Sequence, residues 1–301
     1  MSRVIHPRKI DLHMHTTVSD GTDTPQEILA HVKQAGLEMF AISDHDATKG
    51  CEEILSLLTE EDPVFVCGVE FSCRDALGKY HILGYGYDPK GQSIQDVVNL
   101  GHGYRMYKAR QRIDFLRDAF HFAFSEADED AIYALDNPGK PHIANMMVKY
   151  GYVPSKEVAI RDYLNKLHTK NLYVKPEEAI AGILGAGGIP VLAHPCYGSG
   201  DQLIVGDEMD ARLKRLIGFG LQGVEAFYSG FTPKLTSEML AFAKKYDLYI
   251  TAGSDYHGKN KMISIGDNSL ADQKDLPEGF LRFLRDVKRT CGSATLELSD
   301  F

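Results

Sequence analysis

The sequence contains no apolar stretch that approaches the length needed to cross a bilayer, so no membrane-spanning helix is expected. The basic start, residues 1–9, is not followed by an apolar segment, so no signal peptide is expected. The five cysteines are odd in number and include no Cys-x-x-Cys pair. These absences favour a reduced, cytoplasmic protein without a membrane partner.

Basic residues are also scarce relative to acidic ones, because 33 Lys and Arg stand against 42 Asp and Glu, for a net charge of -9. Extended binding to nucleic acid needs a basic surface and is not expected. A small anionic substrate remains compatible, because divalent cations held by carboxylates make a site locally positive. The 301 residues, 44% hydrophobic and 25% charged, are ordinary for one large globular domain or two small ones. The oligomeric state stays open.

Three short segments are rich in metal-ligand side chains, and each closes an apolar, strand-like run. They are His13-Met14-His15, Ser43-Asp44-His45-Asp46 and Ser254-Asp255-Tyr256-His257. Barrel enzymes place their chemistry at the carboxyl ends of strands, where the following loops converge. Alternate residues of a strand share one face, so His13 and His15 can reach the same ion. The pattern therefore predicts a hydrolytic metal site.

Seven strand-like segments, most of them separated by helical ones, favour an α/β fold with a parallel sheet, open or closed into a barrel. The strands are expected at 9–15, 39–45, 64–71, 80–85, 190–193, 223–228 and 248–254, and the helices at 24–36, 50–58, 176–185, 207–218, 236–246 and 277–289. Between about residues 99 and 174 the alternation stops, and helices are expected at 104–122, 142–150 and 156–167. We expect a body formed by 1–98 and 175–301, with a helical insertion domain at 99–174.

Further candidate ligands are Asp20, Glu70, His81 and His194. His81 begins its strand, but a hairpin around Gly78 would place it at the same rim as Glu70. A single histidine at a strand end is more often structural, so the prediction rests on the whole set. Asp44 is expected to orient a ligand histidine without binding the ion itself. Many histidines with a few carboxylates suit Mn, Fe or Zn, and about nine ligands suit two or three divalent ions.

The motifs, taken together and in this order, resemble those of the PHP (polymerase and histidinol phosphatase) family of metal-dependent phosphoesterases. The resemblance covers most of the chain and rests on Ile10-Asp11-Leu12-His13-Met14-His15, Ser19-Asp20-Gly21, Ile42-Ser43-Asp44-His45-Asp46, Gly68-Val69-Glu70, Tyr80-His81-Ile82-Leu83-Gly84-Tyr85, Ala193-His194-Pro195 and Gly253-Ser254-Asp255-Tyr256-His257. It implies a distorted (β/α)7 barrel with a small helical insertion domain.

The resemblance also implies roles for the ligands. His13, His15, Glu70 and Asp255 would hold one ion, and Glu70 would bridge to a second ion held with His81 and His194. A third ion would be held by Asp20, His45 and His257, which would contact phosphate if that ion is absent. Asp255, His257 and His194 are the expected catalytic residues, and the two histidines are alternative proton donors to the leaving alkoxide.

The insertion resembles the branch of the family that acts on nucleoside 3',5'-bisphosphates and on the 5' ends of short RNA. That likeness rests on 139–144, 151–153 and 174–176, although the family pattern often has Arg where this chain has Lys140. Lys140 and His142, with Arg110 or Arg112, are the expected contacts for a second phosphate, and a solvated helix face is the alternative for the arginines. The N-terminal amides of the helix after Gly139 would favour the same anion.

The expected activity is hydrolysis of a phosphate monoester of a small nucleotide, giving the 5'-monophosphate and phosphate from a 3',5'-bisphosphate. A 5'-3' exonuclease on short RNA or DNA is the first alternative, but a groove that tracks a strand would need more Lys and Arg. A histidinol-phosphate phosphatase fits the insertion less well. A metal-binding module without catalysis is disfavoured, because no ligand position is replaced.

Overall fold

The computed structural model describes residues 3–167, 172–198, 202–271, 273–289 and 296–299. The chain divides into two compact units. Met1–Val98 and Val174–Phe301 form the first, called here the barrel unit, and Asn99–Tyr173 form the second, called the helical unit. None of the helices in these described ranges is long and apolar enough to cross a membrane.

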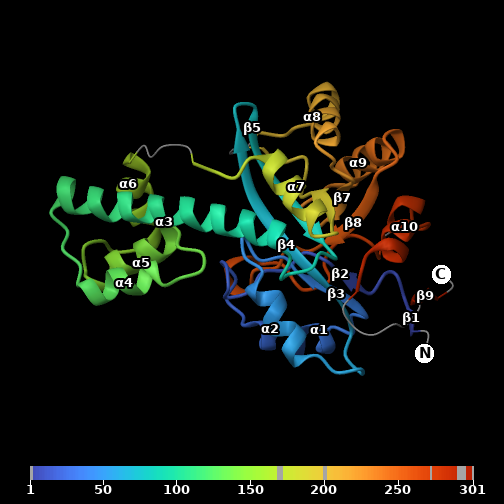
Figure 1. Ribbon diagram of the computed structural model, residues 1–301, viewed down its shortest axis with the longest axis horizontal. Coiled ribbons are helices and arrows are strands. Elements are labelled where there is room, and N and C mark those ends of the chain that lie inside the picture. Colours follow the sequence, from blue (N-terminus) through green and yellow to red (C-terminus); the bar gives the residue numbers. More distant parts are fainter. Residues whose placement is uncertain (1–2, 168–171, 199–201, 272, 290–295, 300–301) are drawn as a thin grey trace. The chain divides into compact units, whose positions relative to one another are not determined.

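The barrel unit is built on a seven-stranded sheet (Figure 1). In spatial order its strands are β2 (Ile10–Asp11), β3 (Met39–Ile42), β4 (Val64–Asp75), β5 (Gly78–Tyr85), β6 (Ile189–Leu192), β7 (Gly223–Tyr228) and β8 (Tyr249–Gly253). Neighbouring strands are parallel except that β5 runs antiparallel to both β4 and β6. The spatial order follows the chain order, so each strand lies next to the one that precedes it in the sequence.

The two edge strands approach each other at their carboxyl ends. The backbone N–H of Leu12 donates to the carbonyl of Ala252 over 3.0 Å, and Met14 pairs in parallel with Tyr256. The sheet therefore nearly closes into a barrel, which confirms the expected α/β fold with seven barrel strands. The antiparallel β5 is the distortion, and it confirms the hairpin expected around Gly78.

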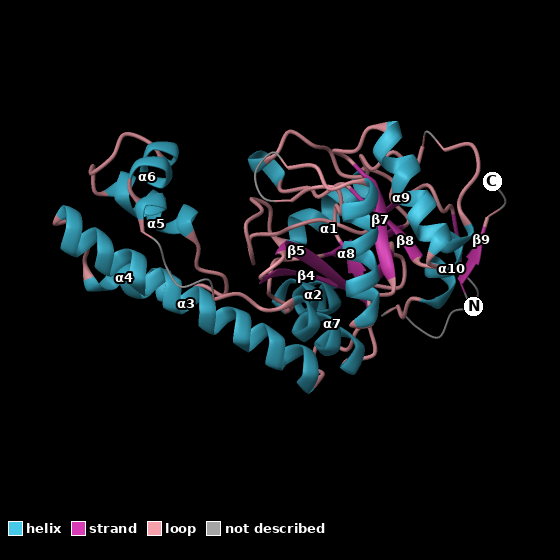
Figure 2. Ribbon diagram, turned by 90° about the horizontal axis from the view of Figure 1, so that it is seen from above, coloured by secondary structure: helices cyan, strands magenta, loops and turns pink. Residues whose placement is uncertain are grey.

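Helices of the barrel unit cover the outside of the strands (Figure 2). They are α1 (Pro25–Gln34), α2 (Lys49–Leu57), α7 (Pro176–Gly185), α8 (Gly206–Gly218), α9 (Pro233–Lys245) and α10 (Glu278–Asp286). A capping box begins α1, because the side chains of Thr24 and Glu27 each accept the other's backbone N–H. Apolar side chains such as Phe40, Phe65 and Phe227 fill the interior.

A short parallel sheet of β1 (Arg3–Ile5) and β9 (Leu296–Leu298) joins the two ends of the chain and was not predicted from the sequence. Helix α3 (Gln92–Phe120) also begins earlier than the expected residue 104. Gly101 and Gly103 lie in its first half, and glycine disfavours helix, which explains why the sequence pattern placed the start after them.

The helical unit contains the rest of α3 with α4 (Glu126–Tyr133), α5 (Lys140–Lys149), α6 (Lys156–Asp162) and the short turn η1 (Leu164–Lys166). Helix α4 was not predicted from the sequence. Fully buried side chains form a core of its own within this unit, including Ile113, Leu116, Ile143, Met147 and Leu164.

Candidate metal centre

The barrel strands and the loops after them supply all nine side chains that the sequence marked as ligands. His13, His15 and Asp20 follow β2, His45 follows β3, His194 follows β6, and Asp255 and His257 follow β8; Glu70 lies within β4 and His81 within β5. In the β4–β5 hairpin His81 pairs with Ser72, two residues beyond Glu70. Because β5 is antiparallel, its first residues lie beside the carboxyl ends of the other strands.

Five imidazoles surround the buried carboxylate of Glu70. Its Oε2 atom lies 3.2 Å from ring nitrogens of His13, His15 and His45, and its Oε1 atom lies 2.8 Å from His81 Nδ1 and 3.0 Å from His194 Nε2. Both carboxylate oxygens therefore face different sets of histidines. This is the arrangement that allows one carboxylate to serve two neighbouring cations.

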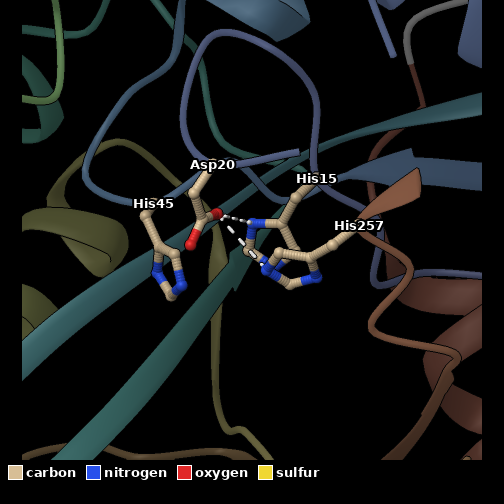
Figure 3. A group of neighbouring side chains, drawn as sticks. All are labelled: His15, Asp20, His45 and His257. Atoms are coloured by element: carbon tan, nitrogen blue, oxygen red, sulfur yellow. Dashed lines mark ion pairs between the residues drawn. The ribbon is translucent and has the colours of Figure 1, made fainter. Parts of the chain in front are cut away.

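Among the described residues, three groups have ligand atoms within 4.8 Å of one another, and each could hold an ion. They are His13–His15–Glu70–Asp255, His45–Glu70–His81 and His15–Asp20–His45–His257. The first has the membership expected from the sequence. The second contains His45 where His194 was expected, and the third also contains His15. In the third group the carboxylate of Asp20 faces both His15 and His257, whose rings stack on each other (Figure 3).

Two nitrogens of the centre are buried without a hydrogen-bond partner, namely His13 Nε2 and His15 Nε2. A buried polar atom without a partner is costly, and such atoms are uncommon in folded proteins. Both nitrogens lie 3.2 Å from the same oxygen of Glu70. A cation bound between imidazole nitrogens and carboxylates would satisfy all of them, so the residues present fit a divalent transition metal.

The carboxylates and histidines of the centre shift each other's protonation. Burial lowers the pKa of His15, but the nearby carboxylates of Asp255 and Glu70 raise it more, to about 9. Burial lowers the pKa of His45 to about 4, since the carboxylates around it compensate only in part. His15 is therefore protonated at neutral pH when no cation is bound, and metal binding must displace its proton.

Glu225 is a member of the centre that the sequence reasoning missed. It is fully buried in β7, its Oε1 atom lies 2.9 Å from His13 Nδ1, and its Oε2 atom accepts the backbone N–H of His194 over 2.8 Å. Partners of this kind fix the orientation of a ligand histidine. The signal was present in the sequence, because Glu225 is the single charged residue of an otherwise apolar strand, 223–228.

Two buried aspartates hold the loops that carry the ligands. Asp11 Oδ1 accepts the backbone N–H groups of His13 and Ser254, over 3.2 and 3.0 Å. Asp44 accepts from the Thr16 backbone over 2.8 Å and from Ser19 Oγ over 2.6 Å. Asp44 therefore acts on the loop after β2 and belongs to none of the three ligand groups found among the described residues.

The backbone is unusual at two of the candidate ligands. His194 and Asp255 have φ angles of 26° and 58°, in the left-handed region that residues with a side chain rarely adopt. Next to Asp255, Gly253 permits a close approach, because a Cβ atom there would lie 2.2 Å from the Cβ of His13. Backbone strain of this kind concentrates at functional sites, where the surrounding structure maintains it.

The expected substrate contacts, Lys140, His142 and Arg110, lie in the helical unit. Lys140 Nζ donates to Asn165 Oδ1 over 2.5 Å, and His142 Nδ1 accepts the backbone N–H of Gly139 over 3.1 Å. The guanidinium of Arg110 lies 5.2 Å from the centre of the Tyr133 ring. Their role as phosphate contacts stays a prediction.

Comparison with known proteins connects this centre to one protein family. The model of the PHP domain matches residues 11–176. A solved structure from Bifidobacterium adolescentis, described as a metal-dependent phosphoesterase, is 31% identical with a TM-score of 0.69 over 86% of this chain and 91% of that one.

Two curated relatives extend the comparison to activities. A 3',5'-nucleoside bisphosphate phosphatase from Chromobacterium violaceum is 28% identical over 275 residues, which are 89% of this chain and 92% of that protein. A 5'-3' exoribonuclease from Haemophilus influenzae is 28% identical over 271 residues, 87% of this chain and 94% of that protein. Both relatives are thus matched over nearly their full length.

Proposed function

The chain belongs to the PHP domain family, a family of metal-dependent phosphoesterases, and from that premise we propose that it hydrolyses a phosphate monoester of a small nucleotide. The proposed substrate is a nucleoside 3',5'-bisphosphate, which gives the 5'-monophosphate and phosphate. One observation carries the proposal: five imidazoles surround Glu70, and two of their buried nitrogens have no hydrogen-bond partner.

In this proposal the three ligand groups hold two or three divalent ions of Mn, Fe or Zn. When bound, such ions supply an activated water and neutralise charge on the phosphoryl oxygens. Glu70 would be a ligand in two of these groups, and Glu225 orients the ring of His13. Asp255, His194 and His257 are the proposed catalytic residues. The side chain of His194 is 16% exposed against 6% for His257, which favours His194 as the proton donor to the leaving oxygen.

The aromatic surroundings of the centre support a nucleotide as the substrate. The ring of Tyr228 lies 5.5 Å from that of His194, and the ring of Tyr197 lies 6.0 Å from Tyr228. Tyr197 is 37% exposed, and its hydroxyl donates to the Gly230 carbonyl over 2.5 Å, which fixes the ring. An exposed, anchored aromatic ring close to a phosphate-hydrolysing centre is suited to stack on a nucleobase.

The role of Tyr197 can be tested by removing its ring. We expect Tyr197→Ala to raise KM for adenosine 3',5'-bisphosphate about 10-fold, since stacking on one base contributes about 1–3 kcal/mol. Steady-state kinetics would show an unchanged KM for ribose 3,5-bisphosphate, which keeps both phosphates but has no base. Tyr197→Phe is the matched control: it keeps the ring and loses only the bond to Gly230, so its KM should rise much less. Equal losses on both substrates would exclude base stacking.

The proposed activity is tested by comparing substrates under one set of conditions with added Mn²⁺. We expect kcat/KM on adenosine 3',5'-bisphosphate to exceed that on a 5'-phosphorylated oligoribonucleotide of a few residues, because the acidic chain lacks the excess of basic residues that a strand-tracking groove needs. The relative named as an exoribonuclease makes the oligonucleotide the informative comparison. A preference for the oligonucleotide would establish the exonuclease instead, and turnover of histidinol phosphate alone would refute both.

A further inference from the structure

The two carboxylate oxygens of Asp255 contact different partners. Its Oδ1 atom faces the histidines of the centre, 3.3 Å from His15 Nε2 and 3.3 Å from His257 Nδ1. Its Oδ2 atom accepts from Lys261 Nζ over 2.5 Å and from the hydroxyl of Tyr228 over 2.9 Å. A cation bound at Oδ1 would therefore not compete directly with Lys261 for Oδ2.

The loop that carries Lys261 is tied to the loop after β2. It follows η2 (Gly258–Asn260), where the backbone N–H of Lys259 donates to Thr22 Oγ1 over 2.9 Å and Asn260 Nδ2 donates to the carbonyl of Asp20 over 2.8 Å. These bonds fix the start of the loop. The side chain of Lys261 is 36% exposed and that of Asp255 is 5% exposed, so the ion pair lies at the boundary between the centre and solvent.

An ammonium group has three N–H donors, and its bond to Asp255 uses one. Phosphoryl oxygens are strong acceptors for the others, and a lysine serves phosphate as a compact point charge. We propose that Lys261 binds a phosphoryl oxygen of the substrate and that Asp255 anchors it for this purpose. The inference rests on the proposed function and adds a phosphate contact that the barrel unit itself supplies.

The competing explanation is that Lys261 only balances the charge of Asp255, a candidate metal ligand. In that case the loss of Lys261 would weaken metal binding. Lys261→Met separates the two explanations, since it keeps the length of the stem without the charge. The matched control is Lys259→Met, which replaces an exposed lysine two residues earlier, in η2. The measurements are the Mn²⁺ affinity of each protein and, by titration calorimetry, the affinity of each Mn²⁺-loaded protein for inorganic phosphate.

We expect Lys261→Met to bind phosphate about 10- to 100-fold more weakly, which corresponds to the loss of one charge-assisted hydrogen bond. Its Mn²⁺ affinity should fall by much less than the 10- to 100-fold that the competing explanation requires, because the hydroxyl of Tyr228 still donates to Asp255 Oδ2. Lys259→Met should be unchanged in both measurements. If Lys261→Met melts early, Lys261→Gln, which retains an amide donor, gives the same comparison with a smaller expected loss.

Unchanged phosphate affinity in Lys261→Met would overturn the inference, as would a fall in Mn²⁺ affinity with normal phosphate binding once the protein is loaded. The titration does not depend on turnover. If the wild type hydrolyses none of the nucleotide esters, the proposed function fails, and the phosphate titration still decides whether Lys261 binds this anion.

Discussion

Replacing Glu70 with Gln is expected to lower kcat/KM for a phosphate monoester by about 10³-fold or more and to remove at least one bound metal ion per chain. The amide has nearly the same shape, but it carries no charge and presents an NH₂ group to at least one of the surrounding imidazoles. The amide therefore cannot act as a shared ligand for two cations, as the carboxylate could. Metal ions contribute several kcal/mol to such reactions, and each 1.36 kcal/mol is a factor of ten in rate.

Elemental analysis and steady-state kinetics on the same preparation check this expectation. Glu52→Gln is the matched control, because Glu52 is an exposed glutamate on α2 and should leave metal content and turnover unchanged. Thermal melting of the metal-free proteins shows whether the variant is folded. A folded Glu70→Gln protein with full metal content and normal turnover would contradict the assignment of Glu70 as the shared ligand.

Replacing Glu225 with Gln is expected to weaken metal binding by about 10- to 100-fold. This is the usual effect of losing a group that is hydrogen-bonded to a metal ligand. Glu225 accepts from His13 on one oxygen and from the backbone of His194 on the other. Glutamine keeps one acceptor but turns an N–H group toward the second donor. His13 then loses its fixed orientation, or the backbone at His194 loses its hydrogen bond.

Metal titration followed by activity separates this variant from Glu70→Gln. Because every ligand remains in Glu225→Gln, excess Mn²⁺ should restore most of its turnover, whereas Glu70→Gln should not recover. If Glu225→Gln binds metal as tightly as the wild type, the buried carboxylate serves the packing of β7 alone.

The sequence predicted the convergence of the ligands because their spacing follows from simple geometry. His13 and His15 occupy alternate positions after β2, and both present Nε2 to the same oxygen of Glu70. The short connection around Gly78 predicted a hairpin, which brings His81 beside Glu70, eleven residues earlier in the chain. Local patterns of this kind determine strand ends and tight turns without knowledge of the rest of the chain.

Interactions between distant segments were beyond the same reasoning. The sequence places Glu225 in a strand. Its role depends on contact with His13, which is 212 residues away along the chain. The pairing of β1 with β9 likewise needs the two ends of the chain to meet. The groups of neighbouring side chains match the expected sets only in part, because strand spacing does not determine whether the ring of His45 or that of His194 turns toward His81.

The β4–β5 hairpin has a consequence for how this protein tolerates change in length. Surface turns usually accept inserted or deleted residues, and the turn between Asp75 and Gly78 lies at the tip of the hairpin. Because successive side chains of a strand alternate between its faces, a shift of one position in this hairpin would turn His81 away from Glu70. The tip is therefore a poor place for a tag or a graft.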